Sequence, residues 1–334
     1  DAADLASFTV TDTVLVDYTL ALANTDNDIV ITATKKSAAA TASALGVSTE
    51  EAASLGSAND ALATGDAAAQ TAMNSALSTG GAVARLAAET VGIQSDTLGA
   101  NSAASIGTGV QVIGVASDRL ALMRSITGEQ FAAANQTGFA SGDGAMNKAF
   151  WARGFGNWTK QDDRGGVAGF DADTLGMSGG VDAQVSDNSR IGVSLSYADT
   201  SVDGKGTGSA KTDIASYQAT IYGDYSTDTY FVEGSLGYAR NSNETSRTVV
   251  LPGLTRTATA DFDSNQYMAN AKAGMPIAVG SKSFFTPTVG ASYTKVTSDT
   301  YTETGAGNLN LTVNPDDVDA FVVSLGGQFH TRIE

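Results

Sequence analysis

The sequence predicts an all-β transmembrane antiparallel β-barrel preceded by an α-helical segment, and three observations support this fold class. Apolar and small polar residues alternate from about residue 149 to 331, which gives each strand one apolar and one polar face. The connections alternate between short turns and long polar loops, as in outer-membrane barrels, whose short turns face the periplasm. No apolar stretch reaches the length of a membrane helix, so a membrane span would consist of strands.

The alternation is clear in residues 190–199, where Ile191, Val193, Leu195 and Tyr197 fall on one face and Gly192, Ser194, Ser196 and Ala198 fall on the other. A soluble β-sandwich shows a similar alternation, so the period alone does not identify the solvent. The loop lengths favour the membrane. Short turns are expected near 186–189, 226–229 and 279–283, and long loops near 160–169, 200–212, 241–261 and 299–319.

About eight strands are expected, at residues 149–159, 171–185, 189–200, 212–226, 229–242, 260–278, 283–298 and 319–331. Aromatic residues gather beside the short turns that join them. Tyr225, Tyr230 and Phe231 flank one turn, and Phe284 and Phe285 lie beside another. This placement predicts an aromatic girdle at the membrane interface, with ordinary core packing as the alternative.

The composition of the chain excludes some classes of function and favours others. The net charge of −17 argues against nucleic acid as a partner, because phosphates require clustered Lys and Arg. Cysteine is absent, which suits a protein that crosses an oxidising periplasm unfolded. The composition changes near Gly144, and only Phe8 and Tyr18 among the aromatic residues precede Phe131. The first part therefore lacks the bulky side chains of a conventional core.

Two β-rich runs, residues 15–22 and 28–34, open the chain and are joined by a polar turn at 23–27. They predict a hairpin or the last rung of a larger β structure. Two strands alone bury too little surface to be stable. We therefore expect residues 1–36 to be the end of a larger upstream domain.

Residues 37–104 are rich in Ala, Ser, Gly and Thr and are expected to be a linker with short helices or disorder. Ser48 with Glu51, and Ser57 with Asp60, each match the capping box that begins a helix.

Residues 105–127 differ from this linker, because Ile106, Val110, Ile113 and Leu120 recur at helical spacing among small residues. A helix of this length measures roughly 33 Å, close to the roughly 30 Å of the hydrocarbon core. Such a slim helix fits inside a barrel, so we expect it in the lumen. Residues 128–148 would then link it to the first strand.

Several motifs carry a family resemblance. Residues 150–158, FWARGFGNW, and 169–173, GFDAD, resemble the opening of the translocator domain of classical autotransporters, which belong to type V secretion. Residues 216–218, SYQ, with 222–223, YG, are similar to a later part of that domain. The most specific match is 301–307, YTETGAG, before an aliphatic run. The similarity covers about residues 117–334.

The resemblance implies a twelve-stranded barrel in the bacterial outer membrane with an α-helix through its lumen. It implies that the domain exports and anchors a passenger at the cell surface. Such passengers are usually β-helical, and residues 1–36 are similar to the end of one. Outer-membrane lipid is an implied partner, together with the barrel-assembly machinery and periplasmic chaperones during biogenesis.

The chain departs from the family at its C-terminus, because it has eight expected strands and ends at Arg332-Ile333-Glu334 instead of a terminal aromatic residue. A closed eight-stranded barrel is filled by its own side chains and has no room for a helix. An open sheet leaves backbone groups unpaired in lipid. We therefore expect residues 149–334 to be a C-terminally incomplete barrel, whose free edges would pair with the assembly machinery if it was captured during assembly.

The alternation assigns polar side chains to the lumen. The register that directs Val232 and Leu236 to lipid directs Glu233 inward, and a charge on the lipid side would cost roughly 2–4 kcal/mol. Arg153 faces inward in a register that also turns Trp151 inward. The lumen-facing candidates are Arg153, Gln218, Glu233, Gln266, Asn270 and Lys272. They are expected to hydrogen-bond the helix or to solvate a wet lumen.

We predict no enzyme, and no catalytic, cofactor or metal site. Residues 176–180 match the G-x-S-x-G elbow, but they lie inside an expected strand with no following helix. The acidic clusters at 171–173, 261–263 and 316–319 lack EF-hand spacing and are expected to be outward-facing loops. Some members of the resembling family cleave their passenger at an asparagine pair. No Asn-Asn pair occurs here, so we expect no self-cleavage of that type.

Three functions remain open from the sequence. The leading one is an outer-membrane translocator that exports a passenger and tethers it through the lumen by the helix. The second is a porin or adhesin-like barrel without cargo, and the third is a soluble all-β surface protein whose apolar faces pack together. What the passenger does cannot be derived from an anchor and a linker.

Overall fold

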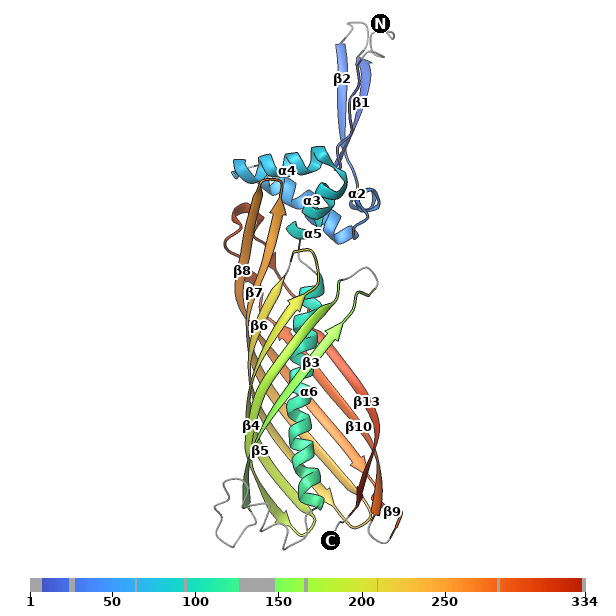
Figure 1. Ribbon diagram of the computed structural model, residues 1–334, viewed down its shortest axis with the longest axis vertical. Helices are drawn as coiled ribbons and strands as arrows, with labels where there is room; N and C mark the ends of the chain where they lie inside the picture. The colour runs from blue at the N-terminus through green and yellow to red at the C-terminus, as the bar shows by residue number, and fades with distance from the viewer. Residues whose placement is uncertain are drawn as a thin grey trace.

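The computed structural model describes residues 8–23, 28–63, 65–92, 95–125, 148–164, 168–208, 210–280 and 283–331. Figure 1 shows three parts along the long axis of the molecule: a two-stranded stem, a group of four helices, and a curved sheet around one long helix. Within the described ranges, no helix has both the length and the apolar character needed to cross a membrane.

Over the described residues, the curved sheet contains eight long antiparallel strands, as many as the sequence predicts. Their order in space is β13-β10-β8-β7-β6-β5-β4-β3, and the short β9 (Ile277–Ala278) pairs with β10. The long strands are β3 (Lys148–Gln161), β4 (Phe170–Ser186), β5 (Ser189–Gly204), β6 (Lys211–Ser226), β7 (Phe231–Leu251), β8 (Leu254–Gly274), β10 (Ser283–Ser298) and β13 (Val318–Thr331). The sheet curls into a half-barrel around α6 (Ser95–Ser125), which confirms the predicted fold class (Figure 1).

The sheet exposes apolar side chains on its outer face and buries polar side chains on its inner face, the reverse of a soluble protein. On β5, the apolar Leu195 is 72% exposed on the outer face, whereas the neighbouring Ser194 on the inner face is 3% exposed. The same pattern continues on β7, where Leu236 is exposed and Ser235 is buried. Apolar faces that packed together would be buried, so the soluble all-β alternative is not favoured. The outer face of the described strands is suited to lipid.

Exposed tyrosine pairs lie on the outer face of the sheet. Tyr225 and Tyr230 flank a short turn with ring centroids 6.2 Å apart. Near the middle of β5 and β6, the ring centroids of Tyr197 and Tyr217 lie 5.1 Å apart. The expected place of Phe231 in the girdle is wrong, because its side chain is 6% exposed and faces inward. Strand alternation explains this, since the next residue, Val232, points outward.

The segment 241–261, predicted as a long loop, is instead the far end of a hairpin. Strands β7 and β8 stay paired up to Leu251 and Leu254, and Gly253 occupies the tight turn with φ of 71°. Thr is the most frequent residue of this segment, and Thr and the paired Val249 and Val250 favour strands. The loop predicted at 200–212 is also shorter, because β5 runs to Gly204 and β6 begins at Lys211.

The N-terminal stem is an antiparallel hairpin of β1 (Val16–Ala23) and β2 (Asp28–Lys35), one of the two predicted alternatives. Its expected turn includes residues 24–27, which lie outside the described residues. The expected linker at 128–148 and the C-terminal Arg332-Ile333-Glu334 also lie outside them, except for Lys148.

The helical cap, which we define as helices α2–α5, lies between the stem and the sheet (Figure 1). Its members are α2 (Ala38–Leu45), α3 (Thr49–Leu62), α4 (Ala67–Thr79) and α5 (Gly81–Val91). Ser48 and Glu51 form the predicted capping box, with backbone-to-side-chain distances of 3.1 and 2.7 Å. Ser57 and Asp60 lie within α3, so the second predicted capping box is wrong.

Helix α6 begins at Ser95, ten residues before the predicted start at Ser105, and ends at Ser125. Its 31 residues span about 46 Å at 1.5 Å per residue. It packs along the inner face of β3 to β8 and β10. The long loop from Ser298 to Val318 contains β11 (Tyr301–Thr302), a short 3₁₀ helix η2 (Gly307–Leu309) and β12 (Thr312–Val313).

Candidate functional site: the helix-binding face of the sheet

The C-terminal end of α6 is bound to the sheet by Arg124. Its guanidinium donates to Asp224 at 2.8 Å and to Glu233 at 2.7 Å. The same group lies 3.8 Å above the centre of the Phe231 ring, which explains why that ring faces inward. Both carboxylate side chains are almost completely buried. Buried carboxylates need such partners, because an unpaired buried charge is strongly destabilising.

Ser117 lies one heptad before Arg124, on the same face of α6, and meets the same carboxylate. Its hydroxyl donates a short hydrogen bond to Glu233 and accepts one from Lys272 at 2.7 Å. Lys272 and Glu233 also form an ion pair at 3.1 Å. Glu233 therefore joins β7, β8 and α6 at one point.

A second carboxylate, Asp182 of β4, binds the helix through Arg119, whose Nε lies 2.8 Å from it. Arg190 of β5 binds the same carboxylate. The hydroxyl of Tyr222 also approaches Asp182, at 3.4 Å, and accepts a hydrogen bond from the indole of Trp151 at 2.7 Å. We call these contacts the helix anchor. It comprises Ser117, Arg119 and Arg124 of α6 with Asp182, Arg190, Asp224, Glu233 and Lys272 of the sheet.

The helix anchor lies at the short-turn end of the sheet. Asp182 and Arg190 flank the turn between β4 and β5, and Asp224 and Glu233 flank the turn between β6 and β7. At the long-loop end, α6 makes apolar and neutral contacts instead. Ala100 and Ala104 pack against four inward-facing residues, Phe170, Ala172, Val202 and Ile214. Among the contacts of α6 that the structure describes, the charged ones are thus concentrated near its C-terminal end.

Midway along α6, Gly109 allows the helix backbone to approach β8 closely. A Cβ atom at this position would overlap the side chains of Gln266 and Met268, which are 1% and 3% exposed. Nearby, the Thr108 hydroxyl lies 3.3 Å from that of Thr200. The helix and the sheet therefore fit each other in shape as well as in charge.

The six lumen-facing candidates have different surroundings. Glu233 and Lys272 meet in the helix anchor, and Gln266 packs against Gly109. Arg153 forms an exposed ion pair with Asp118 of α6 at 2.8 Å. The other two are bonded within the sheet: buried Gln218 donates to Thr220 at 3.0 Å, and half-buried Asn270 donates to the Ala291 carbonyl at 3.5 Å.

Sequence reasoning missed Asp182, Arg190 and Asp224, together with the three residues of α6. The alternation offered a signal for Asp182 and Asp224, because each lies in the inward register of a predicted strand beside a short turn. The motif serine, Ser178, lies within β4, is buried, and accepts a 2.7 Å hydrogen bond from Ser196. In the part of the chain that the structure describes, no three His, Cys, Asp or Glu side chains cluster as metal ligands do.

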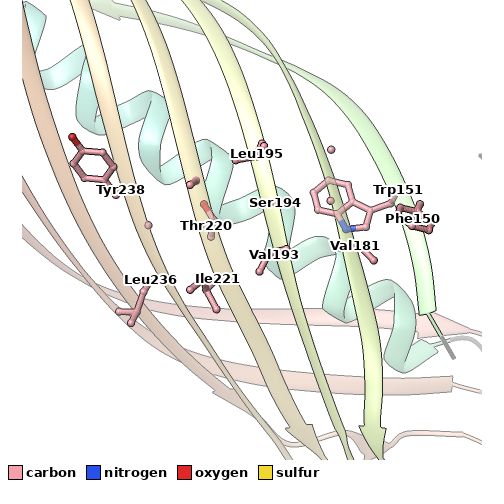
Figure 2. A pocket seen from close by; sticks show the side chains of 14 residues that line it. Phe150, Trp151, Val181, Val193, Ser194, Leu195, Thr220, Ile221, Leu236 and Tyr238 are labelled. Carbon is pink, nitrogen blue, oxygen red and sulfur yellow. The ribbon is translucent and has the colours of Figure 1, made fainter. Parts of the chain in front are cut away.

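The outer face carries a shallow apolar groove of about 810 Å³ across β3 to β7 (Figure 2). Small residues such as Gly179 and Ala219 contribute to its lining. Its walls include Phe150, Leu195 and Leu236, which are all exposed. No charged residue lines the groove, as expected for a surface in the hydrocarbon region.

Comparison with known proteins identifies the second half of the chain. The profile of the family described as "Autotransporter beta-domain" matches residues 150–334. The chain is 29% identical to outer membrane protein A of Rickettsia conorii over 211 residues, which is 60% of this chain and 10% of that protein. It is 27% identical to outer membrane protein B of Rickettsia prowazekii over 244 residues, which is 69% of this chain and 15% of that protein. The chain therefore spans only a small part of these relatives.

Two solved structures are similar to part of the chain. The translocator domain of the autotransporter NalP from Neisseria meningitidis has a TM-score of 0.46 and 18% identity, covering 64% of this chain and 71% of that one. The β domain of the Bordetella autotransporter Brka has a TM-score of 0.45 and 18% identity, covering 56% and 71% respectively.

Proposed function

This chain belongs to the autotransporter β-domain family, and from that membership we propose that α6 tethers an exported passenger through the lumen of the barrel. The domain is an outer-membrane translocator that exports a passenger. Residues 1–36 are, in this proposal, the end of the passenger. The six lumen-facing candidates line the channel around the tether, two of them within the helix anchor.

The observation that carries the proposal is the helix anchor. Arg119 and Arg124 enter a face of the sheet whose buried carboxylates have complementary charge. A helix held only by apolar contacts is free to slide, whereas charge-assisted hydrogen bonds fix its position and rotation. The anchor therefore supports a stable tether at the end of export.

The orientation follows from the loops. Short turns of outer-membrane barrels face the periplasm and longer loops face the outside. The helix anchor then lies near the periplasmic side, and the helical cap and stem lie at the cell surface. The Tyr225–Tyr230 pair beside a short turn would then lie at the periplasmic interface, where aromatic residues of barrels gather.

We further propose that the translocator itself has no catalytic role, because the family is one of secretion and anchoring. The barrel-assembly machinery and periplasmic chaperones are the proposed partners during biogenesis. Unfolded outer-membrane strands expose both apolar side chains and unpaired backbone groups, which such partners would cover until insertion.

Surface display tests the proposal. The complete protein, with an epitope upstream of β1, is produced in the outer membrane of a Gram-negative host, and intact cells are treated with external protease. We expect the epitope to be cleaved in intact cells, while the barrel stays folded and migrates differently before and after heating. A folded barrel whose epitope is protected until the cells are lysed would contradict the proposal.

Conductance separates a tethered translocator from an open pore. We expect the intact protein in planar bilayers to pass little current, because α6 occupies the lumen. A variant that lacks residues 95–125 should conduct strongly if it inserts. High current from the intact protein would favour a barrel without a tether.

A further inference from the structure

We propose that the helical cap is a stop, which folds against the outer end of the sheet and prevents α6 from sliding back toward the periplasm. The inference rests on the proposed function, since it assumes that the long-loop end faces outward. It assigns a role to residues 38–91, which lie outside the family match at 150–334.

The cap shares its apolar core with the sheet. Leu55, Leu62 and Met73 of the cap are fully buried in one cluster, which also contains Val249 and Leu251 from the tip of β7. Ala258 of β8, and Ala306 and Leu309 of the long loop, also belong to this cluster. A core of mostly alanine and leucine side chains is small. The hairpin tip therefore supplies part of the apolar surface against which the cap folds.

A buried arginine of β7 joins these parts. Arg247, which is 5% exposed, donates to the Thr90 carbonyl at 2.8 Å and to the Leu309 carbonyl at 2.7 Å. It also binds both carboxylate oxygens of Glu303, at 2.8 and 2.7 Å. The last carbonyls of a helix have no partner within the helix. Arg247 supplies one to the end of α5.

A second ion pair connects the other side of the cap. Asp66 precedes α4, where its side chain accepts from the Ala69 amide at 3.1 Å, and it also binds the guanidinium of Arg256 on β8. Arg256 donates in addition to the Ala306 carbonyl at 3.0 Å. The cap, the β7–β8 tip and the long loop are thus held together by the same side chains.

The size of the cap makes it a barrier. A single helix with its side chains is about 10–12 Å wide, and the half-barrel encloses one helix. Four packed helices are much wider. Three residues separate Val91 at the end of α5 from Ser95 at the start of α6. A folded cap therefore cannot follow α6 inward, and α6 is held at its outer end by the cap and at its inner end by the helix anchor.

Two matched pairs of variants test the stop. Ala69→Gln places a polar side chain at a fully buried position of α4, and Ala68→Gln makes the same change at the exposed neighbouring position. Arg247→Gln removes the buried link, and Arg240→Gln removes an arginine of β7 whose ion pair with Asp263 is exposed. Each is introduced into the complete protein with the epitope upstream of β1. Surface cleavage of the epitope and heat-dependent migration of the barrel are measured in a pulse-chase.

We expect Ala69→Gln and Arg247→Gln to retain a folded barrel but to lower the surface-exposed fraction of the epitope several-fold, with further loss during the chase. Ala68→Gln and Arg240→Gln should match the unmodified protein. Cleavage of the cap by external protease would show that the cap has unfolded in Ala69→Gln or Arg247→Gln. Normal surface exposure of the epitope in such a variant would overturn the proposal that the cap is a stop. Failure of the unmodified protein to display the epitope would count instead against the proposed function. If the barrel does not fold in Arg247→Gln, the proposed role of the cap as a stop is also refuted, because Arg247 would then be needed for assembly of the barrel.

Discussion

The indole of Trp151 on β3 donates a 2.7 Å hydrogen bond to the hydroxyl of Tyr222 on β6, across the inner face of the sheet. The two rings meet edge to face, with centroids 6.3 Å apart. Strands β4 and β5 separate their backbones, so the contact bridges the curve of the half-barrel. The contact joins the edge strand β3 to the helix anchor, because the Tyr222 hydroxyl also approaches Asp182.

Tyr222→Phe should lower the stability of the folded barrel by about 1–2 kcal/mol, because it leaves the Trp151 N–H without its acceptor. Urea unfolding in detergent, followed by the heat-dependent migration of the barrel, measures the change. Tyr217→Phe removes an outward-facing hydroxyl from the same strand and is the control. Equal effects of the two substitutions would show that the bridge contributes nothing specific.

Glu233→Gln should destabilise the barrel by about 3–5 kcal/mol, because Lys272 then loses its carboxylate partner and Arg124 keeps only Asp224. The exposed pair of Arg240 with Asp263 provides a comparison, and Asp263→Asn should change stability by less than about 1 kcal/mol. The same urea titration compares both variants with the parent. If the two midpoints move together, the helix anchor does not hold α6.

Two glycines of α6 should respond oppositely to alanine. Gly114→Ala meets no neighbouring atom within 4 Å and should stabilise the helix by up to about 1 kcal/mol. Gly109→Ala gains the same helix propensity but forces Gln266 and Met268 to move, at a cost of about 1–3 kcal/mol. We expect thermal midpoints to rise for Gly114→Ala and to fall or stay level for Gly109→Ala. A rise at both positions would mean that α6 lies farther from β8.

Docking of the cap should weaken in acid. The hydrogen bond from Arg256 holds the pKa of Asp66 below its usual 3.8, so the stabilisation is present above pH 3.8 and is lost as the pH falls through the lowered pKa. Cleavage of the cap by an acid-active protease, measured from pH 6 down to pH 2, should increase in this window. Asp66→Asn should remove this step and leave the cap cleavable at higher pH. An unchanged acid step in Asp66→Asn would assign the transition to another group.

Much of the sheet is predictable because the alternation of apolar and polar residues is visible within each strand. Alternation along β5 and β7 placed Leu195 and Leu236 outward and Glu233 inward, and the structure has the same register. The hairpin beyond Asn241 was missed for a physical reason. Its polar residues resemble a loop, and its apolar ones, such as Val249 and Leu251, are buried by the cap and not by lipid.

The cap and the helix anchor depend on contacts between distant segments. Alanine supplies much of the cap core, so its helices have little contrast between their two faces, and the composition alone suggested a linker. The candidates Glu233 and Lys272 followed from strand alternation, but their partner Ser117 depends on the rotation of α6 about its axis. That rotation is determined by Gly109 against β8 and by the arginines together, and periodicity in one segment does not determine it.

The reciprocal fit between α6 and the strands has a practical consequence for chimeric display systems. The arginines on the helix and the carboxylates on the strands come from different stretches of sequence but are matched to each other. A foreign cargo can be joined upstream without disturbing this match, whereas a graft of another protein's helix onto these strands would break it. The helix should therefore be exchanged between members of the family only together with its own strands.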